Sequence, residues 1–165
     1  CDQTGNWDRC ILLGENFLKY FQSNYRTMEI EDLKAVMEDK RDVAQLMHTV
    51  QRFGDKYESA KKILVQYLHD NPESTQVRRI KEKISKLDRI IRENNDWRTV
   101  VSYSQNSRNS LPDRINYLVQ YIRLNPSSKY DQNAQTLLSQ LQSENRSLYQ
   151  TRIEEQRKRQ NADHR

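Results

Sequence analysis

The stretch "LVQYLHDNPES" runs from Leu64 to Ser74, and the closely similar "LVQYIRLNPSS" runs from Leu118 to Ser128. Sliding the chain against itself without gaps pairs residues 42–88 with residues 96–142, and 11 of these 47 positions are identical. Chance pairing would give roughly three identities, so we infer an internal repeat. Each copy of such a repeat carries an apolar surface that is buried only against its neighbours.

The composition predicts long helices around a thin core. Of the 165 residues, 35% are hydrophobic and only three are Gly and three Pro, while 28 basic residues are interspersed with 23 acidic ones. Balanced and interspersed charge argues against disorder. So few breakers favour long helices that are joined by short turns. The sequence therefore predicts an all-α fold.

Helical periodicity is clearest after the first Asn-Pro pair. Apolar residues recur at spacings of three and four from Val77 to Ile91, and basic residues occupy the other positions. Pro72 disfavours helix at Asn71, and Ser74 can cap the helix that follows, so each Asn-Pro pair predicts a turn between helices. The expected helices cover residues 7–25, 27–39, 42–53, 57–70, 74–94, 96–107, 112–124 and 128–155.

These helices predict stacked antiparallel hairpins in a right-handed solenoid with two 54-residue repeats. We expect an N-terminal anchor segment with capping helices at residues 1–41. The two repeats occupy 42–95 and 96–155, and 156–165 form a flexible basic tail. Leu64 and Leu118 are the expected core positions.

The second repeat resembles a known family. Trp97, Val100 and Tyr103, followed by "INYLVQYIRLNPSS", are similar to a tetratricopeptide repeat, which has an aromatic-bearing first helix, a second helix and a closing Pro. The more specific resemblance is to divergent tetratricopeptide-like lipoproteins of the bacterial envelope. The chain departs from the motif at Val101, where Gly is usual, and in its period, which exceeds the usual length of about 34 residues. The resemblance implies a helical-repeat scaffold that binds other proteins.

The first residues resemble the mature end of a bacterial lipoprotein. Cys1 is followed by "DQTGN", and in such proteins this Cys is linked to diacylglycerol. Asp2 resembles the signal that retains enterobacterial lipoproteins in the inner membrane. The resemblance implies a periplasm-facing protein that is lipid-anchored and membrane-associated without spanning the membrane. Two alternatives stay open, namely a disulfide between Cys1 and Cys10 in a secreted protein and an unmodified terminus.

No catalytic or metal-binding motif is present in the sequence. His48, His69 and His164 lie far apart and share no metal-ligand spacing, and neither a nucleophile motif nor a Gly-rich phosphate loop occurs. The sequence therefore predicts that the chain is not an enzyme and needs no cofactor or metal.

The basic stretch from Arg78 to Arg92 contains seven Lys or Arg residues and is a candidate docking face. A solvated helix face, anionic lipid headgroups and an acidic partner are alternative readings of it. Nucleic acid is not expected, because aromatic residues do not alternate with the basic ones. The candidate binding residues on this helix and on the second repeat are Arg78, Arg79, Lys83, Lys86, Arg89, Trp97 and Tyr103.

The sequence thus predicts a non-enzymatic adaptor or structural component of a bacterial envelope assembly. Its partners would be one or more proteins of that assembly, with the membrane reached through Cys1. The alternatives are a basic helical module that binds anionic lipid or nucleic acid, and a secreted helical ligand.

Overall fold

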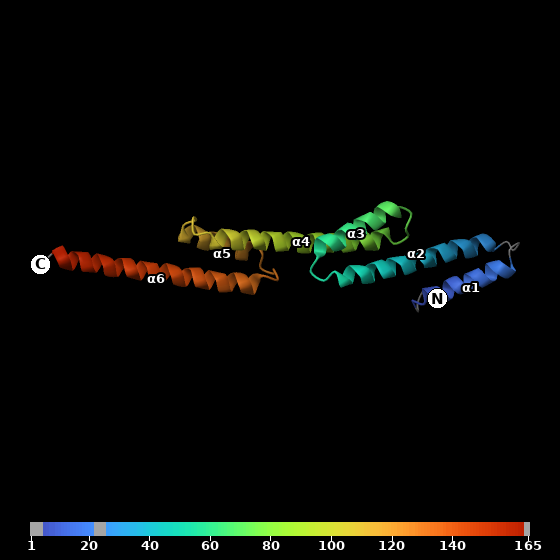
Figure 1. Ribbon diagram of the computed structural model, residues 1–165, viewed down its shortest axis with the longest axis horizontal. Coiled ribbons are helices and arrows are strands. Elements are labelled where there is room, and N and C mark those ends of the chain that lie inside the picture. Colours follow the sequence, from blue (N-terminus) through green and yellow to red (C-terminus); the bar gives the residue numbers. More distant parts are fainter. Residues whose placement is uncertain (1–4, 22–25, 164–165) are drawn as a thin grey trace. The chain divides into compact units, whose positions relative to one another are not determined.

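The computed structural model describes residues 5–21 and 26–163, and every regular element within these ranges is an α-helix, which confirms the all-α fold class. The chain divides into two compact units, Cys1–Ile91 and Arg92–Arg165, so that the boundary falls inside the fourth helix. The helices of the described residues (Figure 1) are α1 (Trp7–Tyr20), α2 (Thr27–Arg52), α3 (Tyr57–Asp70), α4 (Val77–Gln105), α5 (Leu111–Leu124) and α6 (Asp131–Asp163).

Two of the predicted breaks between helices are wrong. The helices expected at 27–39 and 42–53 are both parts of α2, and those expected at 74–94 and 96–107 are both parts of α4. Neither junction contains Gly or Pro, so nothing interrupts the backbone hydrogen bonds there. The apolar stripe changes position within α4, because Ile80 and Leu87 join one core and Val100 joins the other. Similarly, α6 continues to Asp163, past the expected end at residue 155.

Short and long helices alternate along the part of the chain that the structure describes. The short helices α1, α3 and α5 each contain 14 residues. Each short helix and the long helix after it begin at the same spacing, at 7 and 27, at 57 and 77, and at 111 and 131. We call α1–α2, α3–α4 and α5–α6 the first, second and third helix pairs.

The Asn-Pro turns end α3 and α5 as predicted. Asn71 is the C-cap of α3, and its side-chain Nδ2 donates a hydrogen bond to the carbonyl oxygen of Tyr67 at 3.0 Å. Asn125 makes the same bond to Tyr121 at 2.9 Å. Because the next residue is Pro, which cannot continue the helix, the side-chain amide satisfies a carbonyl group that the helix leaves without a partner.

The core of the unit Cys1–Ile91 lies where α2, α3 and the start of α4 meet. Leu64 and Ile80 are fully buried, as is Val43 of α2. Leu64 is therefore a core residue, as predicted. The rest of this buried cluster is Val50, Ala60 and Leu87.

The core of the unit Arg92–Arg165 joins the end of α4 to α5 and α6. Leu118 and Ala134 are fully buried, and Val100, Tyr121 and Leu141 complete the cluster. In the alignment of the two repeats, Leu118, Ala134 and Leu141 are the counterparts of Leu64, Ile80 and Leu87 of the other core. The predicted core position Leu118 is thus also confirmed. Burial of a leucine side chain contributes about 1.5–3 kcal/mol.

Candidate interaction surfaces

Five basic side chains that the sequence marked as a docking face lie on one side of the first half of α4. At about 100° per residue, Arg78, Arg79, Lys83, Lys86 and Arg89 fall within an arc of about 140°, away from the buried stripe. Lys83 is half-buried and the other four are exposed. We call these five residues the basic face of α4.

Few neighbouring acids neutralise the basic face. The Nε atom of Arg78 lies 3.1 Å from Oε1 of Glu82, one turn along the helix. Among the described residues, Arg79, Lys83, Lys86 and Arg89 form no ion pair. An exposed pair such as Arg78–Glu82 contributes little to stability, so most of this charge remains accessible to an anionic surface.

The two aromatic candidates lie in the packing of the second unit. The ring of Trp97 stacks on Tyr130 with centroids 5.2 Å apart and also contacts Tyr121 at 5.7 Å. The ring of Tyr103 lies 4.3 Å from that of Tyr117. Trp97 and Tyr103 are each half-buried, so each retains some surface for a partner while packing against its own unit. The structure does not place Trp97 or Tyr103 in one cluster with the basic face of α4.

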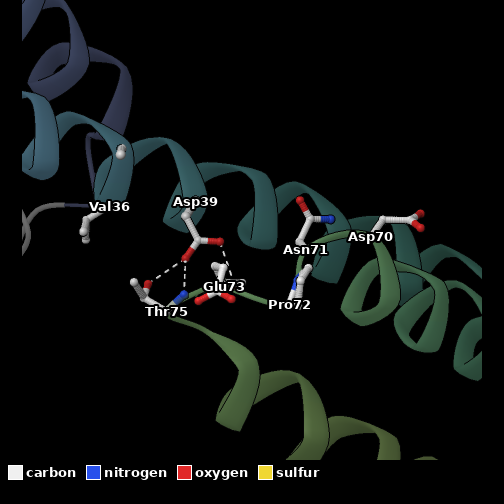
Figure 2. A pocket seen from close by; sticks show the side chains of 9 residues that line it. Val36, Asp39, Asp70, Asn71, Pro72, Glu73 and Thr75 are labelled. Atoms are coloured by element: carbon white, nitrogen blue, oxygen red, sulfur yellow. Dashed lines mark hydrogen bonds between the residues drawn. The ribbon is translucent and has the colours of Figure 1, made fainter.

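A carboxylate that sequence reasoning missed holds the Asn-Pro turn between α3 and α4. Figure 2 shows Asp39 of α2 pointing at this turn, where Oδ2 accepts hydrogen bonds from the backbone N–H and the hydroxyl of Thr75 at 2.8 and 2.6 Å. Its Oδ1 accepts from the Ser74 hydroxyl at 2.7 Å and from the Tyr67 hydroxyl at 3.4 Å. We call this arrangement the Asp39 clasp. It ties the middle of α2 to the start of α4.

The hydrogen bonds of the clasp favour the ionised form of Asp39. Burial alone would raise the pKa of this carboxyl, but the bonds from Thr75, Ser74 and Tyr67 outweigh burial and hold its pKa below the ordinary value of 3.8. Burial and the nearby Asp39 charge raise the pKa of the Tyr67 phenol. Asp39 is therefore a charged acceptor near neutral pH, while Tyr67 is a neutral donor.

A similar clasp occurs in the second unit. Glu93 is the counterpart of Asp39 in the repeat, and its Oε1 accepts hydrogen bonds from the Ser128 hydroxyl at 2.7 Å and from the Lys129 N–H at 2.9 Å. Tyr121, the counterpart of Tyr67, meets the Ser128 hydroxyl at 3.1 Å. The gapless self-comparison began at residues 42 and 96, shortly after this acidic pair. Extending it toward the N-terminus would have paired the two carboxylates.

An open cavity of about 430 Å³ lies beside the Asp39 clasp. It is lined on one side by Val36 and Asp39 of α2 and on the other by the turn, including Pro72 and Glu73 (Figure 2). The Asp39 carboxylate already accepts hydrogen bonds from the turn. We therefore assign Asp39 to holding the helices together and not to binding a ligand in the cavity.

The second unit replaces part of the apolar core by polar groups. Ser104 and Arg114 stand where the first unit has Val50 and Ala60. Arg114 Nε donates a hydrogen bond to the backbone carbonyl of Ser104, and its Nη1 lies 3.7 Å from Oε1 of Glu144. The side-chain hydroxyl of Ser104 is fully buried and has no hydrogen-bond partner among the described residues.

Cys1, the predicted lipidation residue, lies outside the described residues, and so does Asp2. No described helix is both long and apolar enough to cross a membrane. Within residues 5–21 and 26–163, no group of three or more His, Cys, Asp or Glu side chains could hold a metal ion. No model of a known protein family matches the chain, and no significant match is found to a curated protein or to a solved structure.

Proposed function

We propose that this chain is a non-enzymatic adaptor or structural component assembled from three copies of one tetratricopeptide-like helical hairpin. The observation that carries the proposal is the recurrence of one spacing. In all three pairs a 14-residue helix is followed by a long helix at the same distance along the chain, with starts at 7 and 27, at 57 and 77, and at 111 and 131. The first pair was not recognised in the sequence because α1 and α3 begin closer together, at 7 and 57, than α3 and α5 do, at 57 and 111.

A binding role suits this construction. Helical-repeat proteins bury a small core between neighbouring hairpins and leave long helical faces accessible for partners. The core clusters found here are small, and the basic face of α4 is exposed. We therefore place the main contact with an acidic protein partner on Arg78, Arg79, Lys83, Lys86 and Arg89, with Trp97 and Tyr103 on a second surface.

Charge reversal of the basic face tests this role. The five changes Arg78→Glu, Arg79→Glu, Lys83→Glu, Lys86→Glu and Arg89→Glu together should abolish association with the partner, while far-ultraviolet circular dichroism stays unchanged. The matched control reverses five exposed basic residues of α6, namely Arg146, Arg152, Arg157, Lys158 and Arg159. Unaltered association of the first variant would exclude this face and direct the search to Trp97 and Tyr103.

We further propose that the protein is a lipoprotein that faces the periplasm, anchored through Cys1. Native protein should then exceed the polypeptide mass by two or three fatty chains, and Cys1→Ala should release it from membranes. A native protein with an unmodified Cys1, or with Cys1 joined to Cys10, would contradict the anchor but not the adaptor role.

The second candidate function is binding to anionic lipid, and the clustering of five basic side chains on one helix favours it. Each basic residue close to an anionic membrane contributes about 1 kcal/mol. Binding to vesicles that contain phosphatidylglycerol, with a steep loss as salt rises and no binding to neutral vesicles, would support this candidate over a protein partner.

A further inference from the structure

The first helix pair leaves apolar side chains uncovered. The side chains of Leu13 in α1 and Leu33 in α2 are 55% and 52% exposed, and they flank an apolar cavity of about 250 Å³. Gly14 and Phe17 of α1 and Met37 of α2 also line this cavity. We call it the α1–α2 groove. A helix that carries apolar residues on two faces, as α1 does, normally has both of them covered.

The other two helix pairs cover the equivalent surface with a helix. In the second pair, Ala60, Leu64 and Leu87 share one buried cluster with Val43 and Val50, which belong to the end of the preceding long helix. In the third pair, Leu118 and Leu141 pack with Val100 of the preceding long helix α4. Each of these surfaces is therefore closed by the second half of a long helix.

The residues of the groove stand at the same positions as these buried ones. Counting from the start of each short helix, Cys10, Gly14 and Phe17 correspond to Ala60, Leu64 and Tyr67, and Met37 corresponds to Leu87. Leu13 corresponds to Tyr117, whose ring is covered by Tyr103 of the preceding long helix at 4.3 Å. In the first pair, the chain has no long helix ahead of α1 among the described residues to take this place.

The N-terminus of α2 would also favour an occupant helix that carries a carboxylate. In the other two pairs the covering helix supplies a carboxylate, Asp39 or Glu93, to the turn that precedes the next long helix. The N-terminus of α2 carries the partial positive charge of a helix start. A carboxylate on the occupant would complement this charge.

We propose that the α1–α2 groove binds one amphipathic α-helix of a partner protein. That helix carries a carboxylate followed by apolar residues at the fourth, seventh, eighth and eleventh positions, which is the pattern of Asp39, Val43, Leu46, Met47 and Val50. Its apolar side chains pack on Leu13 and Leu33, beside Gly14, which stands where the other short helices carry Leu64 and Leu118. This inference rests on the proposed hairpin repeat and names the chemistry of a partner for it.

The end of α6 of a second copy is a poor occupant of the groove. At the positions equivalent to Val43, Leu46, Met47 and Val50, α6 has Thr151, Glu154, Glu155 and Lys158. Charged side chains on the contact face would lose their hydration without gaining partners in an apolar groove. The polar end of α6 therefore offers the groove no apolar face.

A peptide from the chain itself is the probe. A fluorescein-labelled peptide of residues 37–53, acetylated and amidated at its ends, would be titrated into the full chain and followed by anisotropy. The control peptide has Val43, Leu46, Met47 and Val50 replaced by Ser. We expect saturable binding of the first peptide and at least a tenfold weaker response from the second. Equal binding of the two peptides would overturn the proposal.

Variants of the groove locate the binding. Leu13→Glu together with Leu33→Glu should abolish peptide binding yet keep the unfolding midpoint, because both side chains are more than half exposed. Both changes leave Cys1 and the basic face of α4 intact, so partner association through that face is measured separately from the groove. Peptide binding that survives in this double variant would contradict the proposed location.

A fusion of the covering helix to the chain complements the peptide experiment, because a short isolated helix is only marginally folded in water. Residues 37–56 would be placed directly ahead of Trp7, as they stand ahead of Tyr57 in the chain. Hydrogen exchange of α1 should slow at least tenfold in this fusion and not in its Ser-substituted counterpart. Unchanged exchange in both fusions would overturn the proposal. Concentration-dependent dimers of the full chain that Leu13→Glu dissociates would instead identify a second copy as the occupant and contradict the partner helix.

Discussion

The buried cores of the two units differ in polarity. The first unit places Val50 and Ala60 in its core, whereas the second places the fully buried Ser104 and the partly buried Arg114 at the corresponding positions. Leu64 and Leu118 occupy the same central place in both. The comparison indicates that a central leucine and a turn held by a carboxylate are common to both cores. The residues around them can change from apolar to polar.

The clasps of the two units also differ in the hydrogen bonds that their carboxylates accept. Asp39 accepts hydrogen bonds from Tyr67, Ser74 and both groups of Thr75. Glu93 accepts from Ser128 and Lys129. Tyr67 donates directly to the Asp39 carboxylate, whereas Tyr121 meets the Ser128 hydroxyl instead of Glu93, so we expect the second clasp to contribute less than the first.

The largest effects should come from the central leucines. Leu64→Ala and Leu118→Ala should each lower the free energy of unfolding by about 2–5 kcal/mol, because both remove a fully buried side chain and leave a cavity. Chemical denaturation followed by circular dichroism measures this loss. If one leucine proved dispensable, the two cores would not be equivalent and the shared arrangement would be contradicted.

The clasps come next in magnitude. Asp39→Asn should cost about 1–2 kcal/mol, the lower part of the range for hydrogen bonds to a charged group, since the site is largely open to solvent. Glu93→Gln should cost less. The control is Glu73→Gln, an exposed acid that lines the same cavity as Asp39. A loss from Glu73→Gln as large as that from Asp39→Asn would show that the charge near the turn matters and the clasp does not.

The Asp39 clasp also predicts a pH dependence. The pKa of Asp39 is lower in the folded chain than its ordinary value of 3.8, so the folded state favours the ionised carboxylate. The stability from this group is therefore present above pH 3.8 and is lost as the pH falls through the lowered folded pKa. Asp39→Asn should remove this part of the acid sensitivity. Urea denaturation of both chains from pH 7 down to pH 3 measures it, and parallel curves would contradict the assignment.

The sequence predicted the parts of the fold that follow from local chemistry. The Asn-Pro turns fixed the ends of α3 and α5, because Pro cannot continue a helix beyond its first turn. The continuity of α2 and α4 was not predicted, since α4 contributes Ile80 to one core and Val100 to another and its apolar stripe therefore does not run straight. The clasps depend on contacts between residues 35 or 36 positions apart, which hydrophobic periodicity does not report.

The candidate sites also differ in whether local sequence could predict them. The basic face of α4 could be predicted because its members lie on one helix, where spacing alone fixes which side chains share a side. Trp97 and Tyr103 were chosen as aromatic candidates, but their packing against Tyr130 and Tyr117 depends on other helices. The α1–α2 groove became visible only when the first helix pair could be superposed by position on the other two.

A smaller effect of opposite sign is expected at Ser104. Ser104→Ala should stabilise the second unit by about 1 kcal/mol beyond any gain in helix propensity, because it removes a buried hydroxyl without a partner among the described residues. The matched control is Ser102→Ala on the same helix, where the side chain is exposed and only propensity changes. Comparison of the two variants by thermal and urea unfolding separates the effect of the buried hydroxyl from the effect of helix propensity. Equal gains would show that the Ser104 hydroxyl is satisfied in solution.

The smallest effect on stability is expected at Arg79, which is an exposed basic residue, in contrast to the largely buried Arg114. Arg79 is exposed and has no ion pair among the described residues, whereas the Arg114 side chain is only 13% exposed and bonds to the backbone of Ser104. Arg79→Ala should therefore change the free energy of unfolding by less than about 0.5 kcal/mol. Urea denaturation checks this value, and a loss above about 1 kcal/mol would mean that Arg79 supports the fold. In that case a binding defect in the charge-reversed face could arise from misfolding, so the near-neutral result is what allows such a defect to be assigned to docking.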